Sequence, residues 1–442
     1  MKVLFVYHNV DTKNVRSFPY AIGCLSAFLK KHGHETELLI FQNEPTEDEL
    51  LSHVGLYDPD LIAFSTVTLQ WSETKKYAKI IKKKFDVPII CGGMHPTFMP
   101  EDVIDESSIN MVCIGEGEEA LLEVVNCLEN NGDLSIIPNM WIKNKEGTIF
   151  RNAPRRLIED LDSMPFPDRE IMPYDELLRE NKSEPIFITS KGCPYNCTFC
   201  CNSAIKRLYR GKGRYVRQRS PENIIREIGE FKDKYSLDSL NFYDEAFGFN
   251  RKWLKKFCQM YESEFRLPFG AMVRAETMDR DTFHMMRKAG LAIIYIGVES
   301  GNEELRKSIL GRKMSNETII RTCRDARAEG IQVWSLNMVG LPGETVENIR
   351  ETMELNRIIN PTFVNISMFQ PFPGTKLYEQ CMADNYIKRD YPVNLFEEYT
   401  VLDLPNITND ELMGAFREFK DLADEIRIAS EKEGEFITLV NI

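Results

Sequence analysis

Three cysteines in one short loop are the residues of this chain best suited to chemistry. Cys193, Cys197 and Cys200 lie in the run Lys-Gly-Cys-Pro-Tyr-Asn-Cys-Thr-Phe-Cys, a C-x3-C-x2-C spacing. Three thiolates spaced in this way can hold three irons of a [4Fe–4S] cube and leave the fourth iron without a protein ligand. Such an iron can bind a small molecule and pass it one electron, which no ordinary side chain can do.

Structural zinc is the alternative reading of these cysteines. A structural zinc site takes four protein ligands, and no histidine lies near the loop in the sequence. A fourth cysteine, Cys201, directly follows Cys200, but neighbouring side chains point in different directions, so its sulfur is poorly placed to complete a closed site. The spacing therefore favours an open iron–sulfur site.

The bulk composition is that of a globular enzyme. The chain has 442 residues, with 43% hydrophobic and 28% charged residues, and its net charge of −13 argues against a nucleic-acid partner. No apolar run is long enough for a transmembrane helix. Because oxygen destroys exposed iron–sulfur clusters, we expect a reducing, anaerobic cytoplasm. The other cysteines lie in apolar patterns and are interpreted as small core side chains: Cys24, Cys91, Cys113, Cys127, Cys258, Cys323 and Cys381.

The first part of the chain alternates short apolar strands with amphipathic helices. Strands are predicted at 2–6, 35–40, 61–65, 87–91 and 111–114, with helices such as 22–32 and 71–85 between them. This alternation predicts an α/β domain over residues 1–140, built on a doubly wound, Rossmann-like parallel sheet. Ligands of such sheets bind at the carboxyl ends of the strands, near the point where the strand order reverses.

Polar and glycine-rich runs follow three of these strands. They are Ser65-Thr66-Val67-Thr68, Gly92-Gly93-Met94-His95-Pro96-Thr97 and Gly115-Glu116-Gly117-Glu118. Glycines let the backbone approach a ligand, and hydroxyl and N–H groups can bind phosphate or amide groups. A doubly wound sheet needs glycine turns in any case, so a ligand site and plain turn chemistry both remain open.

The strand–helix pattern resumes after a Pro-rich connector at residues 141–180. Six strands, at 186–189, 239–243, 270–273, 293–298, 332–338 and 363–369, fit a partial (β/α)6 barrel over residues 181–375. The tail, residues 376–442, is expected to hold a helix at 409–431 and a short strand at 436–440. Four tail tyrosines could line a cavity, although packing is the commoner role: Tyr378, Tyr386, Tyr391 and Tyr399.

Charged residues gather at the predicted carboxyl ends of the barrel strands, where barrel active sites lie. Asp244 and Glu245 follow the second strand, and their carboxylates can accept from an ammonium group or cap the next helix. Glu299 ends the fourth strand, and Arg312 comes a short helix later. The fork of N–H donors on Arg312 suits a carboxylate, and a solvated surface charge is the equal alternative.

Together these features resemble the radical S-adenosylmethionine (SAM) family and, within it, the large group with an N-terminal cobalamin-binding domain. The resemblance covers nearly all of residues 1–130 and the barrel. In the cysteine loop it includes the aromatic Phe199 before the last cysteine. Elsewhere it is carried by the following runs: Tyr20–Leu25, Lys31–His34, Gly92–Pro96, Ile114–Glu118, Met164–Asp168, Gly340–Thr345 and Pro371–Thr375.

The resemblance implies a [4Fe–4S] cluster, SAM and cobalamin as cofactors. Cys193, Cys197 and Cys200 would be the catalytic cluster ligands. The implied SAM contacts are Phe199, Asp244, Glu245, Arg274, Glu299, Ser300, Arg312 and Gly340. The implied cobalamin contacts are Ser65, Thr66, Leu69, Gln70, Gly92, Gly93, His95, Gly115, Glu116 and Gly117.

One motif of other cobalamin folds is missing. The Asp-x-His-x-x-Gly run that supplies a histidine to cobalt is absent, and neither His8 nor His95 lies in such a run. We therefore expect the lower face of cobalt to lack a histidine ligand. The segment Leu69-Gln70-Trp71 is the candidate to cover that face.

The function that the resemblance implies is methylation of an unactivated carbon, using methylcobalamin and a 5′-deoxyadenosyl radical. The alternative is a rearrangement, cyclisation or deoxygenation, with cobalamin absent or in another role; a non-catalytic corrinoid sensor is disfavoured by the intact cysteine loop. A low-potential electron donor such as ferredoxin or flavodoxin is the expected partner, and the tail 376–442 would close the substrate side. No motif selects among a peptide side chain, an antibiotic precursor, a lipid and a tetrapyrrole as substrate.

Overall fold

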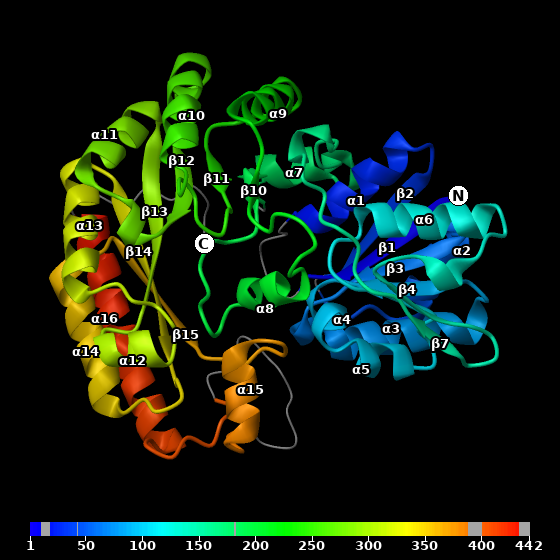
Figure 1. The fold of residues 1–442 in the computed structure, drawn as a ribbon. Helices are drawn as coiled ribbons and strands as arrows, with labels where there is room; N and C mark the ends of the chain where they lie inside the picture. Colours follow the sequence, from blue (N-terminus) through cyan, green and yellow to red (C-terminus); the bar gives the residue numbers. More distant parts are fainter. Residues whose placement is uncertain (10–17, 42, 181–182, 388–399, 433–442) are drawn as a thin grey trace. The chain divides into compact units, whose positions relative to one another are not determined.

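The computed structural model describes residues 1–9, 18–41, 43–180, 183–387 and 400–432. Two compact units divide the chain (Figure 1). Unit 1 contains residues 1–183 and 205–215, and unit 2 contains residues 184–204 and 216–442. The short strand expected at 436–440, together with Tyr391 and Tyr399, lies outside the described residues. None of the described helices combines the length and apolarity needed to cross a membrane.

Unit 1 is built on a seven-stranded sheet in the order β2-β1-β3-β4-β5-β6-β7. Its first five strands are parallel, and the order reverses at β1, as in flavodoxin-like doubly wound folds. The strands are β1 (Lys2–His8), β2 (Glu35–Phe41), β3 (Leu61–Ser65), β4 (Ile89–Gly92), β5 (Met111–Cys113), β6 (Met140–Lys143) and β7 (Ile149–Arg151). The helices are α1 (Tyr20–Lys31), α2 (Glu47–Tyr57), α3 (Trp71–Lys84), α4 (Met94–Phe98), α5 (Pro100–Asp105) and α6 (Glu118–Glu129).

The predicted connector takes part in unit 1 instead of only joining two domains. Strands β6 and β7 extend the sheet as an antiparallel pair at its edge. They are only four and three residues long, too short for a periodic signal. Further along, the Asp168 carboxylate pairs with Lys30 of α1 at 2.6 Å and accepts a hydrogen bond from Ser26. The helix α7 (Tyr174–Arg179) ends this region.

Unit 2 is an open, all-parallel six-stranded sheet, which agrees with the predicted partial barrel. Helices lie along its outer face (Figure 1). The strands run in the order β8 (Ile186–Phe187), β11 (Leu240–Phe242), β12 (Phe269–Val273), β13 (Leu291–Glu299), β14 (Gln332–Val339) and β15 (Phe363–Met368). The helices include α8 (Cys201–Leu208), whose last residues belong to unit 1, and α9 (Pro221–Lys234), α10 (Arg251–Glu264), α11 (Arg280–Ala289), α12 (Glu303–Ser308), α13 (Asn316–Ala328), α14 (Val346–Ile359), α15 (Lys376–Ala383) and α16 (Asn409–Lys432).

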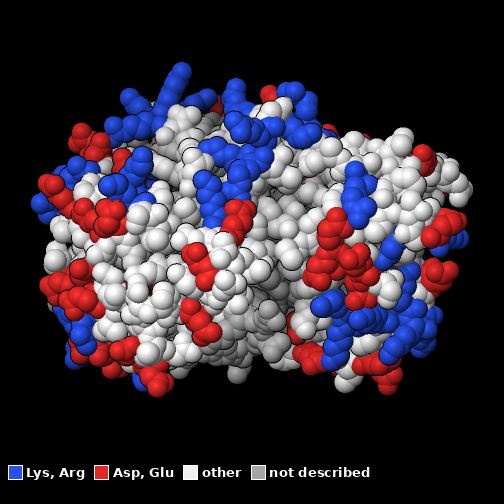
Figure 2. Space-filling model, turned by 60° about the horizontal axis from the view of Figure 1, so that its bottom comes forward, with Lys and Arg blue, Asp and Glu red and all other residues white. Residues whose placement is uncertain are grey.

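Each unit has its own hydrophobic core. The core of unit 1 is mostly aliphatic and also contains Phe64, Trp71 and Tyr77. In unit 2, stacked and edge-on aromatic rings join β11 to α10, among them Phe242, Phe257 and Tyr261. Figure 2 shows Lys and Arg side chains and Asp and Glu side chains in separate groups on one face, with uncharged surface between them. The acidic excess is therefore not gathered into one field on that face.

Candidate active site

The cysteine loop of unit 2 is held at its start by a buried carboxylate. Asp244, which follows β11 and is 1% exposed, accepts hydrogen bonds from the Thr189 amide at 3.0 Å and the Thr189 hydroxyl at 2.7 Å. The Ser190 hydroxyl donates to the same carboxylate. Burial raises the pKa of Asp244. These contacts fix the start of the loop on the Asp244 carboxylate, and the contact of Asp244 with SAM stays a prediction.

The middle of the loop is anchored on two sides. The Thr198 amide donates to the Leu310 carbonyl at 3.1 Å, and the Thr198 carbonyl accepts from the Leu377 amide at 3.1 Å. Gly192 enters the loop with φ +85°, a left-handed conformation that favours glycine. Phe199 packs against an apolar cluster that includes Leu310 and Leu377. Phe199 is only partly buried in this cluster, so its contact with adenine stays a prediction.

The three thiols share one electrostatic environment. Burial raises the pKa of Cys193 to about 11 and also raises that of Cys197, while Arg312 and Arg274 oppose the rise at Cys197. The Cys201 thiol donates to the Cys200 sulfur and thereby lowers the pKa of Cys200. All three thiols are partly exposed and unbridged by disulfides.

No group of three or more His, Cys, Asp or Glu side chains within the described ranges is placed to hold a single metal ion. The three thiols nevertheless interact electrostatically with one another. The ligands of a four-iron cube each bind a different iron and so lie farther apart than the ligands of one ion. Three accessible thiols with two nearby guanidinium groups fit such a cube, because the cations offset the thiolate charge.

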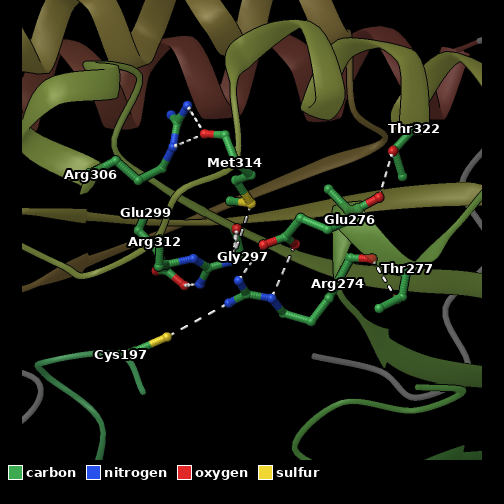
Figure 3. A network of polar contacts seen from close by, with 11 residues as sticks. Cys197, Arg274, Glu276, Thr277, Gly297, Glu299, Arg306, Arg312, Met314 and Thr322 are labelled. Atoms are coloured by element: carbon green, nitrogen blue, oxygen red, sulfur yellow. Dashed lines mark hydrogen bonds and ion pairs between the residues drawn. The ribbon is translucent and has the colours of Figure 1, made fainter. Parts of the chain in front are cut away.

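Glu299 and Arg312 form a buried ion pair at the end of β13 (Figure 3). Arg312 donates to the Glu299 carboxylate at 2.6 Å and to the Gly297 carbonyl at 2.6 Å. A bulge at Gly297 and a left-handed φ of +64° at Glu299 aim this carboxylate at the guanidinium. A Cβ at Gly297 would lie 2.3 Å from Glu299 Oε1 and 2.8 Å from Arg312 Nη1, so a side chain there would displace this ion pair.

The sequence left open whether Arg312 binds a carboxylate or is a solvated surface charge, and the burial of this pair decides between the two. Its relative exposure is 5%, so it is not a solvated surface charge. Burial raises the pKa of Glu299, and the charge of Arg312 opposes that rise. The Arg312 Nε is buried with no hydrogen-bond partner in the described structure, which leaves one donor for a ligand.

Sequence reasoning missed Arg306, which holds the turn beside this pair. Arg306 is 0% exposed and donates to the carbonyls of Ser300 and Met314 and to the side chain of Asn316. Its neighbours in α12 are charged, so nothing in the sequence separates it from a surface arginine. Ser300 is also fully buried, and its hydroxyl accepts from the Asn302 amide. Ser300 therefore makes a local contact in this turn, and its contact with SAM stays a prediction.

Two further predicted SAM residues lie near the thiols. Arg274, after β12, places its guanidinium toward Cys197 and pairs with Glu276 (Figure 3). Glu245 is exposed, and its charge contributes to raising the pKa of Cys193. Both residues therefore act on the thiols of the cysteine loop, and their contacts with SAM stay predictions.

The glycine-rich corner after β14 wraps around a buried acid. The amides of Gly340 and Leu341 donate to Glu344 Oε2 at 2.6 and 3.1 Å. Gly340 has φ +81°, which lets both amides face the carboxylate. Glu344 is 0% exposed, its Oε1 has no hydrogen-bond partner in the described structure, and burial raises its pKa to about 8.

In unit 1 the predicted cobalamin residues are largely engaged in internal packing. Gly93 has φ +104°, and a Cβ there would lie 2.6 Å from the Thr66 carbonyl oxygen and 2.7 Å from its nitrogen. The Thr66 hydroxyl lies 3.1 Å from that of Thr74. Gly93 and Thr66 are therefore explained by the close approach of two loops, without a ligand.

His95 and the segment 69–71 are also turned inward. His95 is 5% exposed, stacks on Trp71, and lies 3.4 Å from an Asp102 carboxylate oxygen. Burial lowers its pKa. Gln70 accepts from the Val67 amide and donates to the His8 carbonyl. Leu69, Gln70 and Trp71 are 9%, 2% and 6% exposed. The three side chains of this segment are buried in the domain, and its place over a cofactor face stays a prediction.

Tyr209, a residue that the sequence did not single out, fixes the loop after β5. Its hydroxyl accepts from the Glu116 amide at 2.8 Å and from the Asn139 side chain at 3.2 Å. A Cβ on Gly115 (φ +78°) would lie 2.0 Å from that hydroxyl. Gly115 is thus a glycine because Tyr209 packs on it. The nearby Gly117 is crowded as well, because a Cβ added there would lie 3.3 Å from a Leu25 methyl group.

Some groups at the carboxyl edge of this sheet are partly exposed. Ser65, Gly92 and Glu116 are half-buried, and Val67 is 38% exposed although apolar. His8 ends β1 beside the β1/β3 switch point, and its Nδ1 is buried with no partner in the described structure. An orphaned polar atom and an exposed apolar side chain at this edge fit a large, partly apolar cofactor.

Comparison with known proteins agrees with both units. A model of the radical SAM superfamily matches residues 187–355, and a model of the B12 binding domain matches residues 11–125. An uncharacterized methyltransferase of Pyrococcus horikoshii is 25% identical over 407 residues, covering 90% of this chain and 86% of the relative. The anaerobic magnesium-protoporphyrin IX monomethyl ester cyclase of Rubrivivax gelatinosus is 25% identical over 396 residues, covering 86% of this chain and 70% of the relative.

Solved structures confirm the predicted fold class. The radical SAM methyltransferase TsrM from Kitasatospora setae, with cobalamin and a [4Fe–4S] cluster bound, matches with a TM-score of 0.70 at 20% identity, covering 86% of this chain and 75% of that one. OxsB, a cobalamin-dependent radical SAM enzyme, matches with a TM-score of 0.74 at 19% identity, covering 95% and 66%. The matches also support the expected cofactors: a [4Fe–4S] cluster, SAM and cobalamin.

Proposed function

We propose that this chain, which matches the radical SAM superfamily over residues 187–355 and the B12 binding domain over residues 11–125, is a cobalamin-dependent radical SAM methyltransferase acting on an unactivated carbon. One observation carries the proposal. A single chain joins a B12-type sheet to a loop with three accessible thiols in a radical SAM sheet. The named methyltransferase relative, aligned over 90% of this chain, supports the same activity.

Each cofactor has residues of this chain that would hold it. In this proposal Cys193, Cys197 and Cys200 bind the cluster, and the half-buried edge of unit 1 near Ser65, Gly92 and Glu116 faces cobalamin. When bound, the cluster supplies the electron that cleaves SAM to a 5′-deoxyadenosyl radical, and cobalamin supplies the methyl group.

The Glu299–Arg312 pair is the proposed recognition site for the methionine part of SAM. That moiety carries an ammonium and a carboxylate. Glu299 can accept from the ammonium, and the unpartnered Nε of Arg312 can donate to the carboxylate. Because the pair is already desolvated, a matching zwitterion gains more from it than it would from exposed charges.

A second candidate reaction is ring formation or rearrangement without methyl transfer. It is favoured by the cyclase relative, whose 25% identity equals that of the methyltransferase relative. The two reactions share the radical step and differ in the fate of the SAM methyl group.

Products formed from SAM separate the two candidates. The reconstituted enzyme, with hydroxocobalamin, a low-potential reductant and methyl-labelled SAM, is supplied with representatives of each substrate class. For a methyltransferase we expect deoxyadenosine and S-adenosylhomocysteine in comparable amounts, and label in the product. Turnover with deoxyadenosine but without label in the product would replace methylation with the second candidate. A triple alanine variant of the cluster cysteines should lose deoxyadenosine while retaining some S-adenosylhomocysteine.

A further inference from the structure

The guanidinium group of Arg274 lies directly against a sulfur of the cysteine loop. Its Nη1 is 3.7 Å from the Cys197 Sγ, close enough for an N–H···S hydrogen bond (Figure 3). Arg312 also acts on this thiol electrostatically, but it donates its hydrogen bonds to Glu299, Gly297 and Met314. Of these two arginines, Arg274 is therefore the one that contacts the sulfur.

Two neighbours hold Arg274 in this place. The guanidinium carbon lies 4.0 Å from the centre of the Tyr195 ring, and Tyr195 belongs to the cysteine loop itself. Glu276 accepts from Arg274 Nη2 at 2.6 Å and from Nε at 3.2 Å. The remaining nitrogen, Nη1, is the one that faces Cys197. Arg274 is 8% exposed, so water screens its charge only weakly.

A cation at this position acts on the redox chemistry of a cluster. When a low-potential donor passes one electron to the cube, the cube with its three thiolates becomes one unit more negative. A nearby cation and an N–H donor to a ligand sulfur both stabilise the more negative form, and hydrogen bonds to sulfur are a known lever on cluster potentials. The Arg274 side chain supplies both from one group.

We propose that Arg274 raises the reduction potential of the cluster through its contact with the Cys197 sulfur, in place of the contact with SAM that its position in the sequence suggested. The inference rests on the proposed function, because it requires the cluster. It names a role for this side chain in accepting the electron, before any chemistry on SAM. Glu276 has the opposite sign and, by offsetting Arg274, limits the effect.

The test is a potentiometric titration of the reconstituted protein without SAM, followed by electron paramagnetic resonance. We expect Arg274→Met to lower the ratio of reduced to oxidised cluster at a fixed ambient potential about tenfold, equivalent to about 59 mV for a one-electron couple. Arg274→Lys keeps the charge but loses the planar fork of donors. The reduction potential of its cluster should lie between those of the wild type and Arg274→Met. Glu276→Gln should shift the potential upward, because it removes a negative charge while a neutral acceptor stays beside Arg274.

Controls separate this role from structural damage. Arg251→Met removes an exposed arginine of the same unit, paired with Asp279, and should leave the potential unchanged. Equal potentials for wild type and Arg274→Met, at equal iron and sulfide content, would overturn the inference. So would a large loss of SAM affinity in Arg274→Met without a shift in potential. A wild-type protein that holds no cluster would instead contradict the proposed function.

Discussion

The polar and glycine residues at the strand ends of the two units differ in what they contact. In unit 1 the glycines and the histidine expected to meet a cofactor mostly meet their own domain: Gly93 meets Thr66, Gly115 meets Tyr209 and His95 meets Trp71. In unit 2 three charged residues at or near strand ends, Arg274, Glu299 and Arg312, are buried, and both arginines act on the Cys197 thiol. Burying charges costs free energy that folding alone rarely recovers.

Because of this difference, the strand ends of unit 2 indicate a ligand more strongly than those of unit 1. A glycine or histidine at a strand end is explained as soon as a neighbour fills the space, so it says little about a ligand. A buried ion pair with an unused donor, such as Glu299 with Arg312, stays unexplained by packing and therefore points to a ligand. Substitutions in each unit can therefore separate residues that bind a cofactor from residues that stabilise the fold.

The largest expected effect concerns the thiols of unit 2. Cys193→Ala, Cys197→Ala or Cys200→Ala should each abolish the reconstituted [4Fe–4S] signal, because each removes the ligand of one iron. Iron and sulfide analysis with electron paramagnetic resonance measures the loss. Cys201→Ala is the matched control and should keep most of the signal, since Cys201 contacts Cys200 but is not a ligand in this assignment. Full iron loading in the triple alanine variant would contradict the assignment.

The next largest expected effect is a loss of folding stability when Gly93 of unit 1 is substituted. Gly93→Val places a branched side chain at φ +104°, with its Cβ 2.6 Å from the Thr66 backbone, so we expect about 3 kcal/mol or more of lost stability. Urea unfolding provides the measurement. Gly92→Ala, whose Cβ would lie at an ordinary 3.4 Å from Cys113 Cβ, should cost under about 1 kcal/mol. Comparable stability of the two variants would show that Gly93 is not required by packing.

The sequence predicted what local patterns encode. Strand Leu61–Ser65 and the start of the helix at Asn409 were placed correctly, because hydrophobic periodicity and capping are local. The sequence placed Glu299 and Arg312 near one strand end, but it did not predict that they pair with each other. Tyr209 and Arg306 were missed because their roles depend on partners brought together by the fold.

A pH effect on stability is expected from Glu344 in unit 2. Its pKa is about 8 in the folded protein against an ordinary value of 4.5. Between these values the folded protein holds a proton that the unfolded chain releases. The free energy of unfolding therefore falls as the pH rises through this window. Glu344→Gln keeps an acceptor for the Gly340 and Leu341 amides and cannot ionise, so its stability should fall less from pH 5 to 8. Parallel curves for the two proteins in urea unfolding would contradict this expectation.

The smallest expected effect is that of Tyr209→Phe in unit 1, which tests whether a residue that packs on a glycine loop also supports cofactor binding. Tyr209→Phe keeps the ring on Gly115 but removes the hydroxyl that accepts from the part-buried Glu116 amide, which should cost about 1 kcal/mol. If the Gly115–Gly117 loop contacts cobalamin, as proposed, corrinoid affinity measured by optical titration should also fall several-fold, because the loop loses its anchor. Tyr77→Phe is the control: the Tyr77 hydroxyl is buried with no hydrogen-bond partner in the described structure, so its removal should not destabilise. A stability loss in Tyr209→Phe with unchanged corrinoid affinity would place this loop, like Gly93, among the parts of unit 1 that serve only the fold.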